Sequence, residues 1–429
     1  MIPHTKKNSP NKHTRFFLVC FSLLFPCLLF AQDTLTLTLV QTDSLFLENN
    51  LELLAQKYKQ DMNHAATIQA RLFDNPTLNT EWNFYNPSKK KYFDVGKNGE
   101  QIIAIDQIIH IAGQRNKRVQ LAKENEVYGT FEFYDLMRTL KFELRNNFQT
   151  YYYNQLTIKK YDEQLLLLDT IIQALSYQSK KGNIPLKEVL RLKAVYYQLN
   201  TDRTELISDL MEAQKNLRTL LRTNAYLNLV FSAKEQSKYK QAGLQVDTLV
   251  NKGIRNRPDL KMAESMLKQS ELNYSLQRKL GVPDMHIGGV YDQAGSYVNQ
   301  YSGLTVGMDV PVFNRNQGNI KLAKANQNYM EAQLKGKSNE VKNEILSSYQ
   351  KLIEIEKEYE KVDVDFGDRF DEINDGFVSN FHKRNISMLE FVDFFESYNQ
   401  SILQLNKLTE KRIKAYEELN YVTGEEIFN

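Results

Sequence analysis

The chain has 429 residues, with 55 Lys and Arg against 52 Asp and Glu, for a formal net charge of +3. The first 31 residues carry four basic residues and no acidic one. Without them the balance is 51 against 52, a net charge of −1. This near-neutral balance predicts no polyanion-binding surface, and therefore no nucleic-acid partner.

Residues 1–31 are predicted to be a signal peptide. Basic residues up to Arg15 precede an apolar run of about fifteen residues, short for a membrane-spanning helix, and a small residue, Ala31, follows at a plausible cleavage site. Both cysteines, Cys20 and Cys27, lie in this leader, and the residues before Cys27 make a poor lipidation signal. We therefore expect an exported protein without disulfides or a reactive thiol.

The proline positions predict very long helices, because proline interrupts a helix. Between 88 and 184, between 186 and 257, and after 311 the chain has no proline. In 114–181, apolar residues recur at helical spacing among polar ones, over a length of about 100 Å if helical. The predicted helices are 42–74, 113–181, 186–223, 248–281, 314–381 and 387–423.

Ordered matches at a steady offset predict a tandem duplication. Asn183-Ile184 matches Asn385-Ile386 at an offset of 202, and Pro76 matches Pro283 at 207. The predicted organisation is a first repeat at 32–223, a linker at 224–247 and a second repeat at 248–429.

Each repeat also contains two stretches of alternating polar and apolar residues, typical of strands. We predict strands at 77–86, 101–112, 284–293 and 303–313, about the length that spans a bilayer when tilted. Four strands cannot close a barrel and open edges are not stable in lipid, so a membrane-spanning sheet requires several copies; three copies supply twelve strands.

A similar junction between strand and helix occurs twice, as IHIAGQRNKRVQLAKE (109–124) and as VPVFNRNQGNIKLAKA (310–325). We expect Pro311 to end the strand pairing, Asn314 to cap the second long helix, and Gly113 and Gly318 to provide the bends. The junction residues are Gly113, Gln114, Arg115, Pro311, Phe313, Asn314, Arg315 and Gly318.

At this point a resemblance is evident. The chain resembles the TolC family of trimeric outer-membrane efflux ducts, especially the branch paired with cation-exporting resistance-nodulation-division pumps. The matching stretches are LFLENNLELLAQ (45–56), DNPTL (74–78), AGQRNKRVQLA (112–122), RNRPDLKMAE (255–264), VPVFNRNQGNI (310–320) and NISMLEFVDFF (385–395).

The resemblance implies an α+β membrane protein: long coiled-coil helical hairpins plus four transmembrane β-strands per protomer, forming a twelve-stranded β-barrel and an α-helical barrel as a homotrimer. It implies a position in the outer membrane lipid, extending into the periplasm, with an equatorial belt at 224–247. The implied partners are a periplasmic adaptor (membrane fusion) protein and an inner-membrane pump of the resistance-nodulation-division type. Members of this branch are often lipoproteins, and the poor signal at Cys27 departs from that.

The resemblance also implies two kinds of site at the far ends of the helical hairpins. The hairpin turns would meet the adaptor, and Glu390 and Asp393, three residues apart on one helical face, would crowd carboxylates at a gate. An acidic ring is also how cation-preferring pores are built. The turn residues are Gly182, Asn183, Ile184, Pro185, Lys187, Arg384, Asn385, Ile386 and Ser387.

No enzyme, cofactor or metal site is expected, since the histidines after the leader are scattered and no catalytic spacing is present. The predicted function is passive export of small solutes or metal cations through a tripartite efflux pump. Two alternatives stay open at this point: the exit duct of a protein-secretion system, and a periplasmic coiled-coil scaffold.

Overall fold

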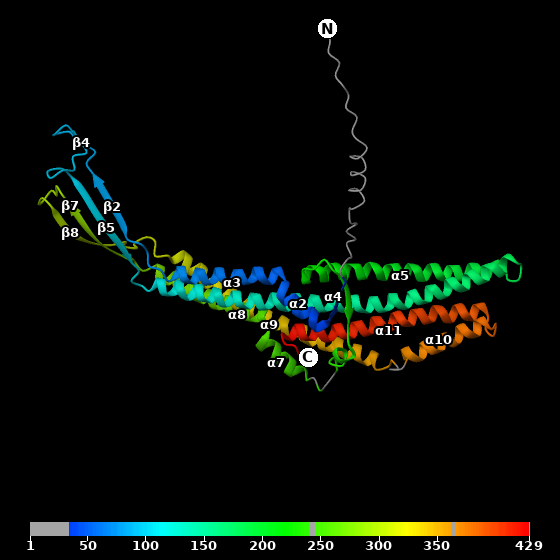
Figure 1. Ribbon diagram of the computed structural model, residues 1–429. Coiled ribbons are helices and arrows are strands. Elements are labelled where there is room, and N and C mark those ends of the chain that lie inside the picture. The colour runs from blue at the N-terminus through cyan, green and yellow to red at the C-terminus, as the bar shows by residue number, and fades with distance from the viewer. Residues whose placement is uncertain (1–33, 241–242, 244, 363–365, 429) are drawn as a thin grey trace, which may run out of the picture.

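The computed structural model describes residues 34–428 except 241–242, 244 and 363–365; the predicted leader 1–31, with Cys27, lies outside the described residues. The molecule is elongated, with a sheet at one end and two helical hairpin turns at the other (Figure 1). The elements in chain order are β1 (Thr34–Thr38), α2 (Leu39–Asn49), α3 (Leu51–Ala70), β2 (Thr77–Trp82), β3 (Tyr85–Asn86), β4 (Lys91–Tyr92), β5 (Gln101–Ile109), α4 (Gln114–Lys180), α5 (Leu186–Leu221), β6 (Tyr226–Val230), α6 (Ala233–Gln236), α7 (Val246–Asn256), α8 (Pro258–Leu280), β7 (Met285–Asp292), β8 (Tyr301–Met308), α9 (Gln317–Tyr359), α10 (Phe366–His382) and α11 (Met388–Thr423).

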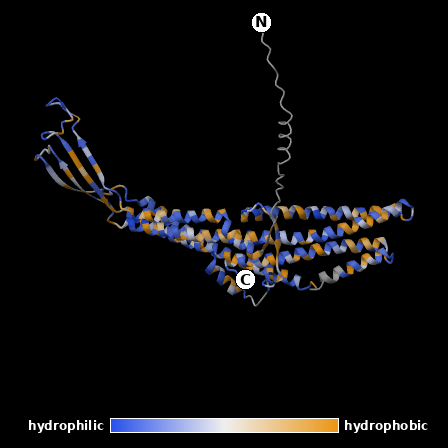
Figure 2. Cartoon of the chain, viewed as in Figure 1, coloured by the Kyte–Doolittle hydropathy of each residue, from blue (hydrophilic) through white to orange (hydrophobic). Residues whose placement is uncertain are grey.

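Helix α4, with 67 residues, is the spine of the molecule and is about 100 Å long. It packs against α3 and α8 on the side of the sheet and against α5 and α11 toward the hairpin turns (Figure 1). The hydropathy colouring shows apolar residues interspersed among polar ones along these helices (Figure 2). Such mixed helices bury their apolar residues only by packing on one another. None of the helices in the described ranges is long and apolar enough to cross a membrane.

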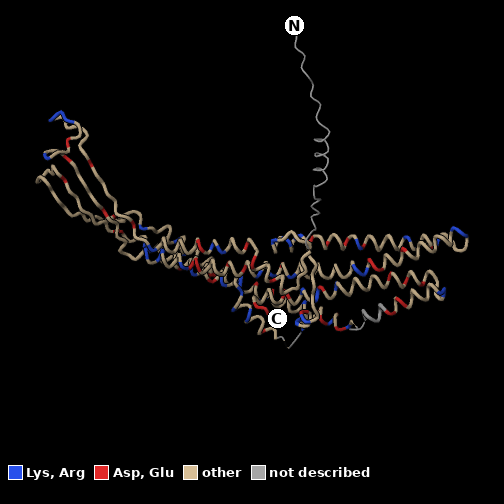
Figure 3. Tube along the Cα trace, in the orientation of Figure 1, with Lys and Arg blue, Asp and Glu red and all other residues tan. Residues whose placement is uncertain are grey.

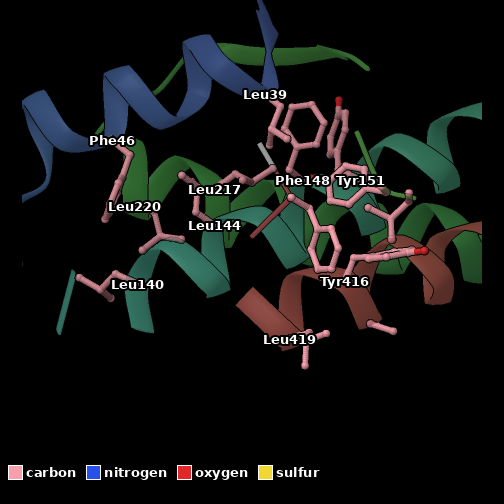
Figure 4. Close-up of a cluster of buried hydrophobic side chains, with 14 of the residues drawn as sticks. Leu39, Phe46, Leu140, Leu144, Phe148, Tyr151, Leu217, Leu220, Tyr416 and Leu419 are labelled. Atoms are coloured by element: carbon pink, nitrogen blue, oxygen red, sulfur yellow. The ribbon is translucent and has the colours of Figure 1, made fainter. Parts of the chain in front are cut away.

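The buried apolar side chains form two clusters. The equatorial cluster lies near the middle of the molecule, where α2, α4, α5 and α11 meet, and Figure 4 shows Phe46, Leu144, Phe148, Leu217 and Tyr416 among the side chains gathered between these helices. The second cluster, here called the tip cluster, lies nearer the hairpin turns. Its fully or nearly fully buried members include Tyr161, Leu168, Ile171, Leu192, Phe391 and Phe395.

Three of the predicted helices are interrupted, which corrects the sequence-based boundaries 42–74, 248–281 and 314–381. The first breaks at Asn50, whose extended backbone ends α2 and whose side chain accepts hydrogen bonds from the backbone of Glu52 and Leu53, each at 3.0 Å. The third breaks between Tyr359 and Phe366.

The second break, at Arg257, has a direct cause in the sequence. Pro258 disfavours helical geometry in the residue before it, and Arg257 is extended, with φ −63° and ψ 121°. Its side chain is buried, lies 2.6 Å from Asp259 and also pairs with Glu344. The break therefore places a charged anchor between α7, α8 and α9.

The predicted linker 224–247 is more ordered than a linker, because it contains β6 and α6. Strand β6 pairs in parallel with β1, in the register Thr36↔Asn228. In both strands every second residue is apolar, and these apolar side chains face the equatorial cluster. The alternating Thr and Leu of Thr34–Thr38 are the pattern from which this strand could have been predicted. The pair joins the start of the described chain to the middle of the molecule.

Four antiparallel strands, all four predicted from the sequence, form the sheet at the far end, and the structure gives their order as β2-β5-β7-β8. The central pair, β5 and β7, joins the two repeats, with Ile105 opposite Gly289. Strands β2 and β8 lie at the two edges, one from each repeat. The paired strands, eight or nine residues long in β5, β7 and β8, are somewhat shorter than the predicted ranges because the chain leaves the ladder before each junction.

Candidate functional site

The sheet has one apolar face that is exposed in the single chain. Residues directly opposite each other on neighbouring strands share a face, so the register assigns every side chain. On β8, Leu304 is 90% exposed and Val306 74% exposed. The apolar members of this face are Leu78, Trp82, Ile103, Ile105, Ile109, Met285, Ile287, Leu304, Val306 and Met308.

The opposite face of the sheet mixes polar and apolar residues. Asn79, Glu81, Asp106, His286 and Thr305 lie on it, together with Ile102, Ile108 and Val290. His286 Nδ1 lies 3.0 Å from Asp106 Oδ2, which couples the two repeats across the β5–β7 pair. A sheet with one apolar face and one mixed face is suited to a boundary between lipid and water.

The first junction between strand and helix is held by residues on both repeats. Gly113 precedes α4 in the left-handed region, φ +71°, a conformation that glycine adopts at little cost. Gln114 is buried and donates a hydrogen bond to Asp284 Oδ1 at 2.9 Å, while Lys279 donates to Ala112 O at 2.6 Å. Arg115 donates to Arg71 O. This junction is therefore clamped to the end of α8.

The second junction differs from the prediction in its bend and its cap. Helix α9 begins at Gln317, and the left-handed residue before it is Asn316, φ +59°, so Gly318 lies inside the helix. Asn314 does not cap the helix; its side chain accepts from the backbone of Asn316 at 3.0 Å. Asn316 replaces glycine because asparagine tolerates the left-handed region.

The two junctions are equivalent in position and both rest on α8. Asn316 donates to Gln277 O at 2.8 Å, two residues before Lys279, whose carbonyl oxygen accepts a hydrogen bond from Gln114. Between β8 and α9, Pro311 is half-buried and Phe313 is 92% exposed. Arg315 lies close to Gly281, where an added Cβ would be 2.7 Å from the Arg315 carbonyl oxygen. Of the predicted junction residues, Phe313 alone is a large apolar side chain left uncovered.

The two hairpin turns have the same backbone hydrogen bonds, although they share few residues. In the first, Gly182 N donates to Ser179 O at 2.9 Å and Asn183 N to Gln178 O at 3.0 Å; in the second, Arg384 and Asn385 make the same bonds to Phe381 and Asn380, each at 2.9 Å. Both are left-handed helix caps. The exposed turn residues are Gly182, Asn183, Pro185, Lys187, Arg384, Asn385 and Ser387, with Ile184 and Ile386 half-buried.

Glu390 has a structural role beside the predicted gate, and the spacing Ser387-x-x-Glu390 is the sequence signature of that role, a capping box. Its carboxylate accepts from Ser387 N at 2.7 Å, while Ser387 Oγ accepts from Glu390 N at 3.2 Å, a reciprocal cap at the start of α11. The hydrogen bond from the Ser387 backbone lowers the pKa of Glu390. Glu390 is therefore held at the helix start, and its charge is partly used there.

Asp393 is exposed and has no ion pair or hydrogen bond with any residue that the structure describes. Its neighbours Phe391 and Phe395 are buried in the tip cluster, which fixes the rotation of α11 and turns Asp393 outward. At the offset of 202, Glu390 aligns with Glu188 and Asp393 with Arg191. The charge difference between the repeats thus lies at Asp393, and the gate assignment stays a prediction.

This geometry lets the two carboxylates be tested separately. Asp393→Asn removes only a free charge, so we expect the permeability ratio of cations over anions to fall in planar-bilayer recordings. Glu390→Gln removes the second charge but keeps the cap, because glutamine can also accept the hydrogen bond from the Ser387 backbone. This variant therefore tests the charge of Glu390 alone. Ser387→Ala should cost about 1 kcal/mol of helix stability without changing selectivity. Unchanged selectivity in the Asp393→Asn channel would remove this residue from the gate.

An ion cluster at the equator went unrecognised in the sequence. Arg145 on α4 lies 3.0 Å from Glu417 on α11 and 2.7 Å from Asp43 on α2, and Tyr239 donates its hydroxyl to Glu417. Arg145 and Glu417 are buried. Although burial opposes its charge, the carboxylates of Glu417 and Asp43 raise the pKa of Arg145. These four residues are far apart in the sequence, so no local sequence pattern predicts the cluster.

Comparison with known proteins finds the same fold among solved structures. No family model matches the chain, and no curated protein does. Among solved structures, the Campylobacter jejuni CmeC outer membrane channel is similar with a TM-score of 0.74 and 12% identity, over 91% of this chain and 87% of that one. The open state of the Neisseria gonorrhoeae MtrE outer membrane channel gives 0.69 and 13%, over 91% and 89%.

A structure of CusC, described in terms of folding and transmembrane channel formation, is similar with a TM-score of 0.69 and 15% identity, over 90% of this chain and 92% of that one. At such identities the likeness concerns the fold. The fold predicted from the sequence, long helices with four antiparallel strands, is confirmed. The chain has the TolC-like outer-membrane channel fold.

Proposed function

We propose that the chain is the outer-membrane exit duct of a tripartite efflux pump, a passive and non-enzymatic channel from the periplasm to the exterior. The observation that carries the proposal is the sheet. Its exposed face is apolar over all four strands, and it lies at the end of a helical body about 100 Å long. Apolar strands of this length fit the lipid, and the helices fit the periplasm.

The open edges of the sheet support a homotrimer. Strands β2 and β8 each have an unpaired side, and unpaired backbone groups are not stable in lipid. Three copies supply twelve strands, more than the eight that side chains alone fill, so the barrel would enclose water. The helices would continue this wall as an α-helical barrel. The same association would cover the exposed edges of all copies at once.

The partners and the cargo are finer proposals that rest on the sequence resemblance. The cation-exporting branch favours metal cations or small toxic solutes, a periplasmic adaptor and an inner-membrane pump of the resistance-nodulation-division type. The hairpin turns are the surface furthest from the sheet, where an adaptor would reach the duct (Figure 1). Export of small solutes fits a passive tube whose selectivity is set mainly by its inner-membrane partner.

Two other functions are separated from this one by different measurements. A soluble periplasmic scaffold would not need the exposed apolar face of β8, on which Leu304, Val306 and Met308 follow one another. The exit duct of a protein-secretion system shares the whole architecture and differs only in its partners. Genes that neighbour this one and encode a pump or a secretion ATPase separate these two ducts.

The decisive experiment is extraction from outer membranes, followed by mass determination in detergent and conductance in planar bilayers. We expect a homotrimer that aggregates when detergent is removed and that opens a water-filled conductance. A monodisperse monomer that is soluble without detergent would contradict the membrane sheet. A trimer without conductance would leave the architecture and contradict the duct.

The hairpin turns give a further prediction. Lys187 and Arg384 are exposed beside the two turns. We expect the double reversal Lys187→Glu and Arg384→Glu to reduce crosslinking of the adaptor, because it inverts the charge of both docking surfaces, while trimers persist. Lys193→Glu, exposed on α5 beyond the first turn, is the matched control. Equal crosslinking in all three proteins would mean that these cations are only solvated loop residues.

A further inference from the structure

The loop beyond β2 concentrates positive charge at the outermost end of the molecule. Between Asn83 and Glu100 it contains Lys89, Lys90, Lys91 and Lys97 against only two carboxylates. All four lysines are exposed, and the basic residues gather at the far end of the sheet, at the place of β4 (Figure 3). The near-neutral net charge of the whole chain hides this local patch.

The same hairpin also carries exposed aromatic side chains. Phe84 lies two residues beyond Trp82, the last residue of β2, and its ring makes edge contacts with Tyr92 at 5.8 Å and Phe93 at 5.3 Å. Each of these four side chains is more than half exposed. Exposed aromatic residues at the end of a lipid-facing strand are typical of the boundary between acyl chains and headgroups. The lysines then lie at the depth of the headgroups.

The hairpin is built to hold this arrangement. Asp94 is buried and accepts hydrogen bonds from Asn86 at 3.0 Å and from Lys91 at 3.1 Å, and it pairs with Lys89 at 3.1 Å. Lys90 has no ion pair among the described residues, and neither has Lys97. One carboxylate thus organises two lysines and leaves two free.

The backbone gives independent support. Lys90 and Phe93 have positive φ angles, +49° and +46°, in the region that favours glycine or asparagine. A basic and an aromatic residue are therefore kept where smaller residues fit more easily. The matching loop of the second repeat, 293–300, has no charged residue. The patch is a feature of the first repeat alone.

We infer that the Lys89–Lys97 hairpin binds the phosphate groups of anionic lipids in the outer leaflet, with its aromatic residues inserted beneath them. The inference rests on the proposed membrane position of the sheet. Its ligand is a phosphorylated lipid headgroup: lysine ammonium groups pair with phosphate oxygens, and the acyl chains meet Phe84 and Phe93. A trimer carries three such patches, each outside one wall of the barrel.

Trp82, the only tryptophan of the chain, reports on this site. We propose to reconstitute the full-length trimer in phosphatidylcholine bilayers with a minor share of phosphatidic acid, brominating one lipid or the other, and to measure quenching of Trp82 fluorescence. The expected association constant is about five-fold higher for phosphatidic acid, the preference of roughly one lysine near an anionic surface. High salt should reduce it.

The variants decide the outcome. Lys90→Gln with Lys97→Gln keeps the Asp94 pairs and should abolish the preference, whereas Lys57→Gln with Lys193→Gln, exposed on the helices, should keep it. Equal quenching by both lipids in the parent protein would overturn the inference and leave the duct intact. No quenching by either lipid would overturn the membrane position itself. Loss of the preference in millimolar inorganic phosphate, at constant ionic strength, would reveal a site for free phosphate and also overturn the lipid assignment.

Discussion

Replacing Leu304 by lysine is expected to prevent stable insertion of the sheet into the membrane. Leu304 is 90% exposed on the apolar face of β8, near the middle of the strand. Lysine on the lipid face near the bilayer midplane costs about 2–4 kcal/mol, and every copy in an assembly bears that cost. The first measurement is the yield of trimer in outer membranes. The second is the urea concentration at which the protein unfolds from phosphatidylcholine vesicles.

Thr305→Lys is the matched control, because it adds the same charge one residue later. Thr305 lies opposite Gly288 on the other face of the sheet, where a lysine would meet the water of the lumen. We expect near-normal trimer yield and a smaller cation preference of the conductance. Equal loss of trimer in both variants would mean that the two faces are not divided between lipid and water.

Removing Arg145 is the second change expected to have a large effect. Arg145→Met keeps much of the volume but leaves Glu417 buried without its cation, and breaking a buried ion pair from one side costs about 3–5 kcal/mol. We expect a large fall in the temperature at which the helices of the trimer unfold, as measured by circular dichroism. The effect should be structural, with unaltered conductance in trimers that survive.

A surface pair provides the control for this change. Arg203 lies 2.5 Å from Asp162, but both side chains are partly exposed, so Arg203→Met should cost no more than about 1 kcal/mol. Adding Glu417→Gln to Arg145→Met removes the uncompensated charge and should restore part of the lost stability. Equal stability of the Arg145 and Arg203 variants would show that the ion cluster at the equator contributes little.

Local patterns in the sequence were sufficient for the sheet and the long helices. Alternation from Leu304 to Val312 predicted β8, although the strand ends at Met308, and the gaps between prolines predicted α4. The breaks were harder. Pro258 announces the break at Arg257, but Asn50 interrupts a helix only because its side chain caps the next one and donates to Leu220 O, a contact 170 residues away.

At the predicted functional sites, too, contacts between residues distant in the sequence were not predicted. Gly318 was the natural candidate for a bend, yet Asn316 adopts the left-handed conformation because its side chain also bonds to Gln277 on α8. Glu390 was predicted only as a gate carboxylate, although the spacing Ser387-x-x-Glu390 already marks the helix cap that the fold contains. The Arg145 cluster combines residues of α2, α4 and α11 with Tyr239 from the turn after α6, so only the folded chain reveals it.

The parallel pair of β1 and β6 constrains how the length of this protein can evolve. Between these strands the chain travels to the sheet, along the whole of α4 to the first hairpin turn, and back along α5, and it must return to the register Thr36↔Asn228. Seven residues added on one side of the turn would misplace β6 by about 10 Å; seven on each side would extend the hairpin and restore the register. If the second hairpin grows equally, the tube becomes longer while its middle is unchanged. In the duct proposed above, paired insertions of two helical turns would therefore fit the tube to periplasms of different depth.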